Sequence, residues 1–384
     1  MRHPPQTDTR EKKGFRRMPE SRTLVVSDLH LHAGSDPAMA RDFVRLLDQS
    51  PADLLVINGD LFDLDRVAGE KHGGIGPRRA AARAARVLDG FPHVAAALRR
   101  WLTRGRIVWL PGNHDAEICL PAVQRELRSR LESTTGRIQF EDQAYRENGV
   151  HIEHGHQHDP DNRFYPDTAS AVAKQRLSAL PLGCLTTRFL LCRIPAYENR
   201  GDNHQGPFSV LLRVLKNHRW ATPWMVLLYF VSGLRTAFHA LLARRRKDAP
   251  PDSSMSGAFR IIRRMYLDRV VLTTVLVTLL LLGFALGPNL AVLGAGLPFA
   301  AILMVPPARK QQYRFRDRLG CQMAAGERIR RGARVVIMGH THHPEGKTDS
   351  KGVYLNPGAF SLPTESGRPY VVLEGITARL DYLS

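Results

Sequence analysis

Three short apolar runs in the first third of the chain alternate with longer stretches that have helical spacing. The runs Thr23–Ser27, Asp53–Asn58 and Arg106–Leu110 are rich in aliphatic residues, a pattern typical of buried strands. Between them, Pro37–Gln49 repeats its apolar residues at helical intervals, and the Ala- and Arg-rich stretch Arg78–Arg104 predicts one long helix. This order of strand, helix, strand, helix, strand predicts an α/β sheet with parallel strand pairs.

The strand pattern continues beyond residue 110 and resumes near the end of the chain. A helix is predicted near Leu120–Leu131, and seven short β patterns follow it. The strand-forming parts therefore lie on both sides of a long middle segment with a different character. The seven β patterns are Arg137–Phe140, Ala144–Arg146, Val150–His154, Arg334–Met338, Gly352–Leu355, Tyr370–Leu373 and Ala378–Tyr382.

The most apolar part of the middle segment has no charged residue from Val270 to Ala308. Two apolar blocks, Val270–Leu286 and Leu290–Val305, flank the turn signal Gly287–Asn289. Each block has about 17 residues, the lower limit for a helix that crosses a bilayer. We predict a helical hairpin over 270–305 that inserts into a membrane. A buried helical hairpin in a soluble domain is the alternative.

Basic residues flank this hairpin on both sides. Between Thr186 and Gly320 there are 20 Lys and Arg residues against 6 Asp and Glu, a surplus of 14 in a chain whose formal net charge is +19. Because positive residues are retained in the cytosol, we expect the protein at the cytoplasmic side of the cell membrane, on an anionic lipid surface. Trp224–Ala243 contains Arg235 and His239, so it is expected to lie in the membrane interface or to pack on the rest of the protein.

Residues 1–22 are polar and basic, and they contain no apolar stretch typical of a secretory signal. We expect a disordered basic tail there; a nucleic-acid-binding arm is the less favoured interpretation. The four cysteines form no CxxC pair, which favours reduced thiols over disulfides or a zinc knot. The predicted organisation is a tail (1–22), the first part of a domain (23–160), a basic helical insertion (161–320) and the last part of that domain (321–384).

Five short polar clusters each follow a predicted strand. They contain carboxylates, an amide and imidazoles, a donor set that suits borderline-hard divalent ions such as Mn, Fe, Zn or Co. Because α/β sheets bind ligands at the carboxyl ends of their strands, the clusters are expected to meet. They are Asp28-Leu29-His30, Gly59-Asp60-Leu61-Phe62-Asp63, Gly112-Asn113-His114-Asp115, His154-Gly155 and Gly339-His340-Thr341-His342.

Such a donor set fits the hydrolysis of a phosphate ester. The reaction needs a hydroxide, neutralisation of the phosphoryl oxygens and help for the leaving group, and two cations about 3.5–4 Å apart provide the first two. A carboxylate that bridges both ions fixes their separation, and an imidazole outside the coordination shell can protonate the leaving oxygen. We therefore expect a dinuclear, metal-dependent phosphoesterase that hydrolyses a phosphate ester or a pyrophosphate bond.

In this order the five clusters resemble the signature of the calcineurin-like metallophosphoesterase family. The resemblance spans Leu24–Gly155 and Arg334–Leu383. It implies an α/β (α+β) fold, a β-sandwich flanked by helices, which here carries the membrane-associated helical insertion. It also implies a role for each polar residue. Asp28, His30 and His342 would hold the first metal, Asn113, His154 and His340 the second, Asp60 would bridge the two, and His114 would be the acid or electrostatic partner of the scissile phosphate.

Each cluster taken alone has an ordinary alternative explanation. Asp28 and Asp60 could cap helices, Asn113 could be a turn residue, and the histidines could lie on the surface. The five clusters together favour the metal site. Two nearby carboxylates, Asp63 and Asp115, are expected to orient ligands rather than to bind metal. Four further histidines are expected at the rim of the site or in contact with substrate: His32, His156, His158 and His343.

The insertion joins the domain between His154-Gly155 and Gly339-His340, so its ends are expected beside the metals. A basic, membrane-associated segment at this place favours a phosphorylated, anionic or lipid-linked small molecule as the substrate. The Ser27–Leu31 and Gly59–Asp63 clusters are also similar to those of the UDP-2,3-diacylglucosamine hydrolases, which makes a pyrophosphatase of that kind the first alternative. Those enzymes usually have Arg in place of His114, Asp in place of His156, and a shorter insertion.

A membrane-tethered nuclease or nucleic-acid-binding protein is the second alternative, since the basic surplus would suit phosphate backbones. The basic residues adjoin apolar segments, however, and aromatic residues do not alternate with them as a base-stacking surface would need. Nucleic acid is therefore not expected as a partner. A non-enzymatic scaffold would have lost metal ligands, and the sequence retains all of them.

Overall fold

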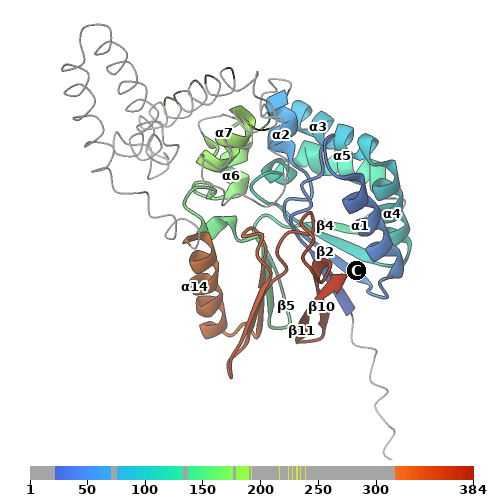
Figure 1. Ribbon diagram of the computed structural model, residues 1–384, viewed down its shortest axis with the longest axis vertical. Coiled ribbons are helices and arrows are strands. Elements are labelled where there is room, and N and C mark those ends of the chain that lie inside the picture. Colours follow the sequence, from blue (N-terminus) through green and yellow to red (C-terminus); the bar gives the residue numbers. More distant parts are fainter. Residues whose placement is uncertain are drawn as a thin grey trace, which may run out of the picture.

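The computed structural model has two β-sheets packed face to face, with helices on their outer sides (Figure 1). The predicted tail 1–22, apart from Arg22, and the predicted hairpin 270–305 lie outside the residues that it describes. The described residues are 22–70, 76–132, 137–175, 179–189, 192 and 316–384, with single positions at 216, 224, 227, 231, 234 and 238.

The first sheet has the strand order β11-β10-β1-β2-β3-β4. Its centre is parallel, because β1, β2, β3 and β4 run in the same direction, and β10 and β11 extend it in antiparallel fashion. The parallel strand pairs predicted for the first part of the domain are thereby confirmed. The strands are β1 (Arg22–Val26), β2 (Leu54–Asn58), β3 (Arg106–Leu110), β4 (Ile138–Phe140), β10 (Arg368–Glu374) and β11 (Thr377–Leu383).

The second sheet has the order β5-β6-β7-β9-β8 and mixes parallel with antiparallel pairs. Val150 of β6 pairs with Val335 of β7, although the whole insertion separates the two strands in the sequence. The two parts of the domain are therefore joined within one sheet. The strands are β5 (Ala144–Glu147), β6 (Val150–Glu153), β7 (Val335–Met338), β8 (Glu345–Thr348) and β9 (Val353–Asn356).

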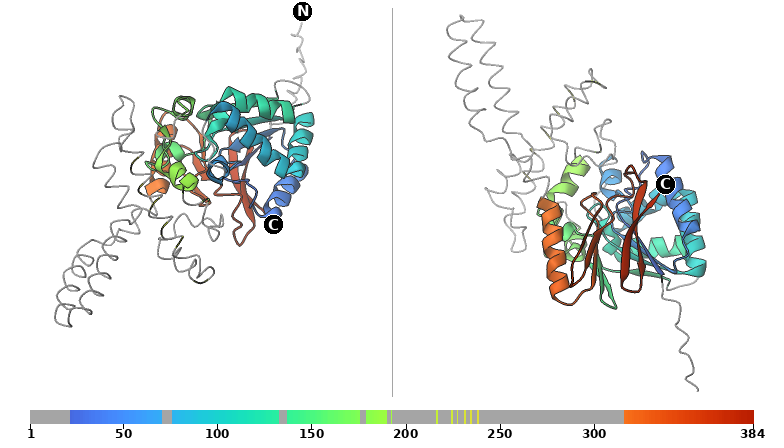
Figure 2. Two further views of the ribbon diagram at one scale, coloured as in Figure 1. Left: turned by 90° about the horizontal axis from the view of Figure 1, so that it is seen from above. Right: turned by 60° about the horizontal axis from the view of Figure 1, so that its bottom comes forward.

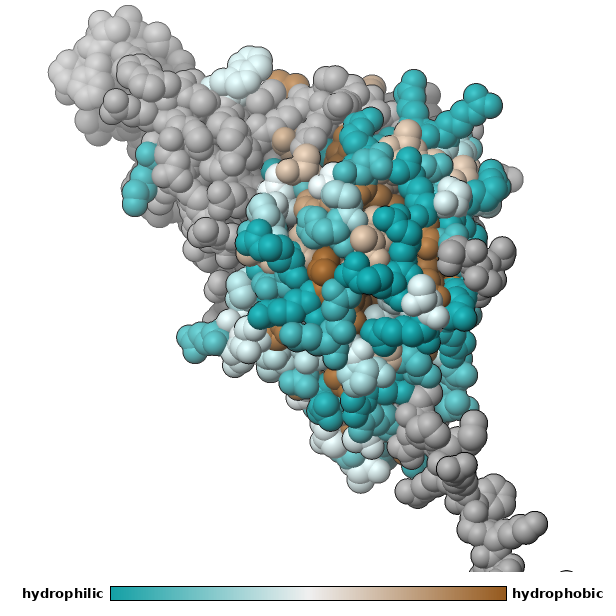
Figure 3. All heavy atoms as spheres, turned by 90° about the vertical axis from the view of Figure 1, so that its right-hand side faces the viewer, coloured by the Kyte–Doolittle hydropathy of each residue, from teal (hydrophilic) through white to brown (hydrophobic). Residues whose placement is uncertain are grey.

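Helices cover the outer side of each sheet (Figures 1 and 2). Four of them lie over the first sheet, and the side of the molecule that they form is largely hydrophilic (Figure 3). One helix lies along the second sheet, and three short helices lie at the end of the sandwich where the polar clusters meet. The four helices over the first sheet are α1 (Pro37–Gln49), α3 (Pro77–Gly90), α4 (Pro92–Arg104) and α5 (Pro121–Leu131). The helix along the second sheet is α14 (Arg316–Arg330). The three short helices are α2 (Leu64–Glu70), α6 (Thr168–Ala173) and α7 (Leu182–Phe189).

The central strands are apolar throughout because both of their faces are buried. On β1, Leu24 and Val26 pack against the helices, whereas Val25 packs between the two sheets. On β7, Ile337 faces the first sheet and Val336 packs under α14. This two-sided burial explains why the strands appear in the sequence as continuous apolar runs.

The predicted single helix Arg78–Arg104 is two helices, α3 and α4, that meet at Phe91. Pro92 has no N–H to donate to the preceding turn, and its ring excludes a continuous helix there. It therefore ends α3 and occupies the first turn of α4. The prediction of one long helix was wrong because it followed the Ala- and Arg-rich composition and took no account of Pro92.

The predicted α1 agrees with the structure at both ends. Asp36 caps it by accepting a hydrogen bond of 2.8 Å from the N–H of Ala38, and Pro37 follows as the first residue. Its apolar residues, such as Phe43 and Leu47, point into the core. Within the described part of the chain, no helix combines the length and apolar character needed to cross a membrane.

Candidate metal centre

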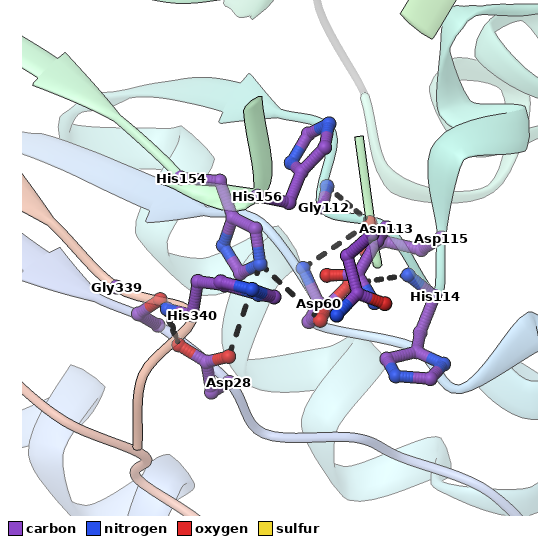
Figure 4. Close-up of polar contacts among 12 residues, drawn as sticks. Asp28, Asp60, Gly112, Asn113, His114, Asp115, His154, His156, Gly339 and His340 are labelled. Atoms are coloured by element: carbon purple, nitrogen blue, oxygen red, sulfur yellow. Dashed lines mark hydrogen bonds and ion pairs between the residues drawn. The ribbon is translucent and has the colours of Figure 1, made fainter. Parts of the chain in front are cut away.

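The five polar clusters meet at one end of the sandwich (Figure 4). Asp28 follows β1, Asp60 follows β2, and Asn113 follows β3, so the first sheet supplies three of them. The second sheet supplies His154 after β6 and His340 after β7. The site therefore lies at the carboxyl ends of strands from both sheets, as α/β sheets favour.

Backbone strain is concentrated at these residues. Asp28, His30, Asp60, His340 and His342 all have φ between 51° and 68°, in the left-handed region that residues with a Cβ rarely adopt. Each such residue costs about 1–3 kcal/mol and persists only where the surrounding structure holds it. Strain at five of the seven predicted metal ligands indicates a functional site.

Three glycines let the ligand-bearing loops approach one another. A Cβ on Gly112 would overlap the carboxylate of Asp60, and a Cβ on Gly59 would overlap the ring of His154. A Cβ on Gly339 would overlap the side chains of Ser27 and Asp28. The glycines of the GD, GN and GH motifs are therefore required because only glycine leaves room for these side chains.

Asp28, His30 and His342 form the first group of converging donor atoms. Nε2 of His342 lies 3.2 Å from Nε2 of His30 and 3.2 Å from Oδ1 of Asp28, and Oδ1 lies 3.7 Å from Nε2 of His30. Ligands bound to one ion at about 2.0–2.2 Å stand at roughly such distances from one another. Since the other oxygen of Asp28 accepts from the N–H of His340 at 3.1 Å, Oδ1 is left for a metal.

Asp28, Asp60 and His154 form a second, overlapping group. Nδ1 of His154 lies 2.8 Å from the carbonyl oxygen of Asn58, which can only accept, so Nδ1 carries the proton. Nε2, which lies 3.3 Å from Oδ2 of Asp60, is thereby the ring nitrogen left to bind a metal. Oδ1 of Asp60 accepts from the N–H of His114 at 2.8 Å. One oxygen of Asp60 is thus held by the protein, and the other faces the histidines.

Asn113 and His340 lie beside these groups and contact the turn at residues 159–162, where the predicted insertion begins. Nδ2 of Asn113 donates to Asn162 at 3.2 Å, whereas its buried Oδ1 makes no hydrogen bond to the described residues. Nε2 of His340 lies 3.0 Å from Oδ2 of Asp159, which leaves Nδ1 as the ring nitrogen outside this contact. Asp159 also accepts from Asn162 at 2.6 Å, so the three side chains are linked.

These donors fit divalent cations. Oδ1 of Asp28, Oδ1 of Asn113 and Nε2 of His154 are buried and, among the described residues, have no hydrogen-bond partner. A buried acceptor without a partner is costly, and a bound cation satisfies it. The donor set of oxygens and imidazole nitrogens is also that of a divalent metal site. The His and Asp residues of this cluster are therefore a candidate metal-binding site.

A comparison with protein families decides what kind of protein carries this site. The family model described as calcineurin-like phosphoesterase matches residues 21–219, more than half of the chain. The chain belongs to the calcineurin-like phosphoesterase family. It is therefore a metal-dependent phosphoesterase, as the five clusters predicted.

Two further comparisons add little to this family assignment. A search of curated proteins gave no match. One crystal structure resembles the chain with a TM-score of 0.35 and 11% identity, over 96% of this chain and 100% of the other. Another, phosphopantetheinyl hydrolase (PptH) from Mycobacterium tuberculosis, has a TM-score of 0.28 and 13% identity, over 89% and 90% of the two chains.

His114 of this phosphoesterase lies against a group of carboxylates. Its Nδ1 is 3.3 Å from Oδ2 of Asp65 and 3.8 Å from Oδ1 of Asp63. Burial lowers the pKa of His114, but Asp65, Asp60 and Asp63 outweigh burial and raise the pKa to about 10. The protonated imidazolium is thus favoured beside Asp60.

The two aspartates that face the histidines remain ionised despite their burial. Burial raises the pKa of Asp28, but His154, His30 and His342 outweigh it and hold the pKa well below the ordinary value. For Asp60 burial acts in the same direction, and His154 and His114 overcome it, so its pKa is also lowered. Both carboxylates are therefore available as anionic ligands at neutral pH.

Asp115 holds the ligand loops together. Its Oδ1 accepts from the N–H groups of Gly112 at 2.7 Å and Asp60 at 3.1 Å, and its Oδ2 accepts from Phe62 at 3.3 Å. It touches the loops that carry Asp60 and Asn113 rather than the metal-facing atoms. Asp63 has a different place: its Oδ1 accepts from the N–H of Arg66 at 2.9 Å and so caps α2.

Two of the further histidines do not lie at the rim. His156 is completely buried and its Nε2 bonds Oγ1 of Thr168 at 2.9 Å, while His32 is also buried. His158 is partly exposed and its Nε2 lies 2.9 Å from Glu153. Burial thus contradicts the rim position for His156 and His32, whereas their contact with substrate stays a prediction. Spacing alone could not show this, since all four histidines adjoin ligand motifs in the sequence.

Sequence reasoning missed several residues that contact the site. Asp65, Arg188, Asp159 and Asn162 belong to none of the five clusters, yet each is one or two contacts from a predicted ligand or from His114. Asp65 stands two positions after Asp63, a signal that could have been used. Arg188 is 123 positions from Asp65, and no local pattern marks it.

Proposed function

We propose that this phosphoesterase binds two divalent ions, of Mn, Fe, Zn or Co, and hydrolyses a phosphate ester or pyrophosphate bond of an anionic or lipid-linked small molecule at the cytosolic face of a membrane. One observation carries the dinuclear proposal. The groups His30–Asp60–His114 and Asp28–Asp60–His154 share Asp60, whose Oδ2 lies 3.3 Å from His154 and 3.9 Å from His30. Asp60 therefore stands between the donors of both predicted sites.

When bound, such a pair of ions lowers the pKa of a water molecule and neutralises phosphoryl oxygens. Different residues of the chain would hold the two ions. Asp28, His30 and His342 would hold one ion, Asn113, His154 and His340 the other, and Asp60 both. The carbonyl of Asn58 fixes the ring of His154, and the main chain of His340 fixes the carboxylate of Asp28.

His114 would protonate the leaving oxygen. It follows Asn113 directly, and its N–H bonds Asp60. His30, Asp60 and His114 also form a group of converging donor atoms, so the ring lies beside the proposed metals. Its ring centroid lies 5.3 Å from that of His30. The carboxylate of Asp65 favours the protonated ring, which is the form that donates.

The membrane part of the proposal rests on the insertion. Five of its apolar side chains, at helical positions three or four residues apart, are between 47% and 61% exposed. Helical residues with this spacing share one face. An exposed apolar face in a segment with a basic surplus is typical of helices that lie on anionic membranes. The five residues are Trp224, Leu227, Val231, Leu234 and Phe238.

A substrate panel tests the proposal. Purified, metal-loaded protein is assayed with nitrophenyl phosphate, bis-nitrophenyl phosphate, UDP-diacylglucosamine and single-stranded DNA, with the Asp28→Asn variant as a matched inactive control. We expect turnover of the small esters, and of a lipid-linked substrate in anionic vesicles. Preference for UDP-diacylglucosamine would favour the pyrophosphatase alternative, and preference for DNA would favour the nuclease. No turnover of any substrate would contradict the proposed function.

A further inference from the structure

A chain of four buried charged side chains leads from His114 to helix α7. Oδ2 of Asp65 faces Nδ1 of His114 at 3.3 Å, and Oδ1 of Asp65 accepts from Nε of Arg188. Nη2 of Arg188 donates to Oε1 of Glu117 at 2.6 Å, and Nη2 of Arg83 donates to the same oxygen at 3.0 Å. None of these four side chains, Asp65, Arg188, Glu117 and Arg83, is more than 4% exposed.

Each carboxylate oxygen of Asp65 faces a different side chain. Arg188 occupies Oδ1 from one side, so the carboxylate cannot rotate without breaking a buried ion pair, and Oδ2 is held toward His114. The main chain adds to this hold, because the N–H of Asp65 donates to the carbonyl oxygen of His114 at 3.3 Å. His114 is thus held both at its backbone and at its ring.

Helix α7 also reaches the metal-binding loop. Sγ of Cys184, one turn before Arg188, donates to the carbonyl oxygen of Asn113 at 3.1 Å. The N–H of Gly183 donates to the carbonyl oxygen of Asp161 at 2.9 Å, close to the Asp159–Asn162 turn beside His340. Helix α7 therefore touches the loop that carries both Asn113 and His114, and the turn next to the other predicted ligands.

We infer that Arg188 is a positioning residue, which holds the carboxylate of Asp65 against His114 and so makes the proton donor depend on the docking of α7. This inference rests on the proposed function, since it gives His114 the role of acid. Arg188 lies in the segment predicted as the insertion, and the inference gives this residue a place in the catalytic geometry of the sandwich. Loss of Arg188 would leave Asp65 free to turn away, and the ring of His114 would lose its fixed orientation.

A matched pair of substitutions tests the inference. Arg188→Lys and Arg83→Lys both shorten a buried arginine that bonds Glu117, but only Arg188 also bonds Asp65. We expect Arg188→Lys to lower kcat for an alkyl phosphate by about 10- to 100-fold, as small displacements of a catalytic group do, with less effect on nitrophenyl phosphate. KM and metal content should stay unchanged. Arg83→Lys should lower thermal stability without changing the dependence on the leaving group.

A double-mutant cycle with His114→Ala distinguishes positioning from general stabilisation. Once His114 is absent, Arg188→Lys should have no further effect on kcat. An equal fold-loss with and without His114 would overturn the inference. Asp65→Asn in the same cycle serves as the second variant where Arg188→Lys does not fold, and it should also lose its effect in the His114→Ala protein.

A spectroscopic readout keeps the inference separate from the proposed function. In metal-loaded protein with ¹⁵N-labelled histidine, the ring resonances of His114, assigned by their absence in His114→Ala, should shift in Arg188→Lys and Asp65→Asn but not in Arg83→Lys. Unshifted resonances in Arg188→Lys would contradict the positioning role whether or not any ester is hydrolysed. A wild-type protein without turnover would contradict the proposed function alone.

Discussion

Oδ1 of Asp60 accepts a hydrogen bond of 2.8 Å from the backbone N–H of His114, so the predicted bridging ligand also holds the main chain of the predicted acid. The two residues come from different loops, after β2 and β3, and Asp115 bonds the main chain of both loops. The proposed bridging ligand and the proposed proton donor are therefore held by one set of hydrogen bonds. Substitutions can separate the two functions only if they spare this contact.

Replacement of Asp60 is expected to remove metal. Asp60→Ala should abolish hydrolysis and weaken binding of both ions, because its Oδ2 lies 3.9 Å from His30 and 3.3 Å from His154, one histidine of each proposed ligand set. Asp60→Asn retains an oxygen that can accept from His114 but lacks the anionic ligand. It should keep the fold better than Asp60→Ala and still lose the metals. Elemental analysis checks this, and two ions at wild-type stoichiometry with full activity would exclude the bridging role.

His114→Ala is expected to keep both metals and lose rate. General acid catalysis contributes about 10²–10⁴-fold, and the loss should be larger for an alkoxide than for nitrophenolate, which leaves without a proton. Single-turnover rates on the two esters, with elemental analysis as control, check the prediction. An equal loss on both esters would instead assign His114 an electrostatic role.

The buried ion pairs on α7 predict a pH-dependent stability. Burial raises the pKa of Glu117, but Arg188 and Arg83 outweigh it and hold the pKa below the ordinary value of 4.5. The folded state therefore binds this proton less readily than the unfolded chain, so Glu117 stabilises the fold above that value. The stabilisation is lost as the pH falls below it toward the folded-state pKa.

Thermal unfolding measured from pH 7 to pH 3 tests this dependence. The wild-type Tm should fall with decreasing pH more steeply than that of Glu117→Gln, whose side chain does not titrate. Exposed acidic residues titrate equally in both proteins, so the difference between the two curves reports on Glu117. Parallel curves would show that Glu117 does not contribute.

The predicted hairpin remains a prediction, and its deletion tests it. Replacement of Val270–Val305 by a short linker should give a protein that leaves the membrane fraction and still hydrolyses nitrophenyl phosphate. Its turnover of a lipid-linked substrate in anionic vesicles should fall, because the enzyme no longer shares a surface with the substrate. Recovery of the full-length protein in the soluble fraction without detergent would contradict both the hairpin and the lipid preference.

Local patterns predicted most of the sandwich and the composition of its site. Strand β3 agrees with its predicted bounds, β1 is shifted by one residue at both ends, and β2 begins one residue later than predicted, because strands buried on both sides are continuous apolar runs. Asp28, Asp60 and His154 could be singled out because each stands one or two residues after such a run. Helix α14 was missed because its Gly- and Arg-containing sequence has little helical periodicity.

Contacts between distant segments could not be predicted in the same way. Arg188 and Asp65 pair across 123 positions, and Asp159 meets His340 across 181. Neither pair belongs to a short motif, and each depends on how α7 and the turn after β6 pack on the finished sandwich. The residues that orient the site thus follow from tertiary packing, whereas the predicted metal ligands follow from motifs.

Metal dependence tests the central proposal most directly. Elemental analysis and nitrophenyl phosphate turnover are measured on the same samples of full-length protein: as purified, after chelation, and after stepwise return of Mn²⁺. We expect two ions per chain, loss of hydrolysis with their removal, and recovery that is complete only when the second ion has bound. Full hydrolysis by metal-free protein, or full recovery at one ion per chain, would contradict the two-metal site.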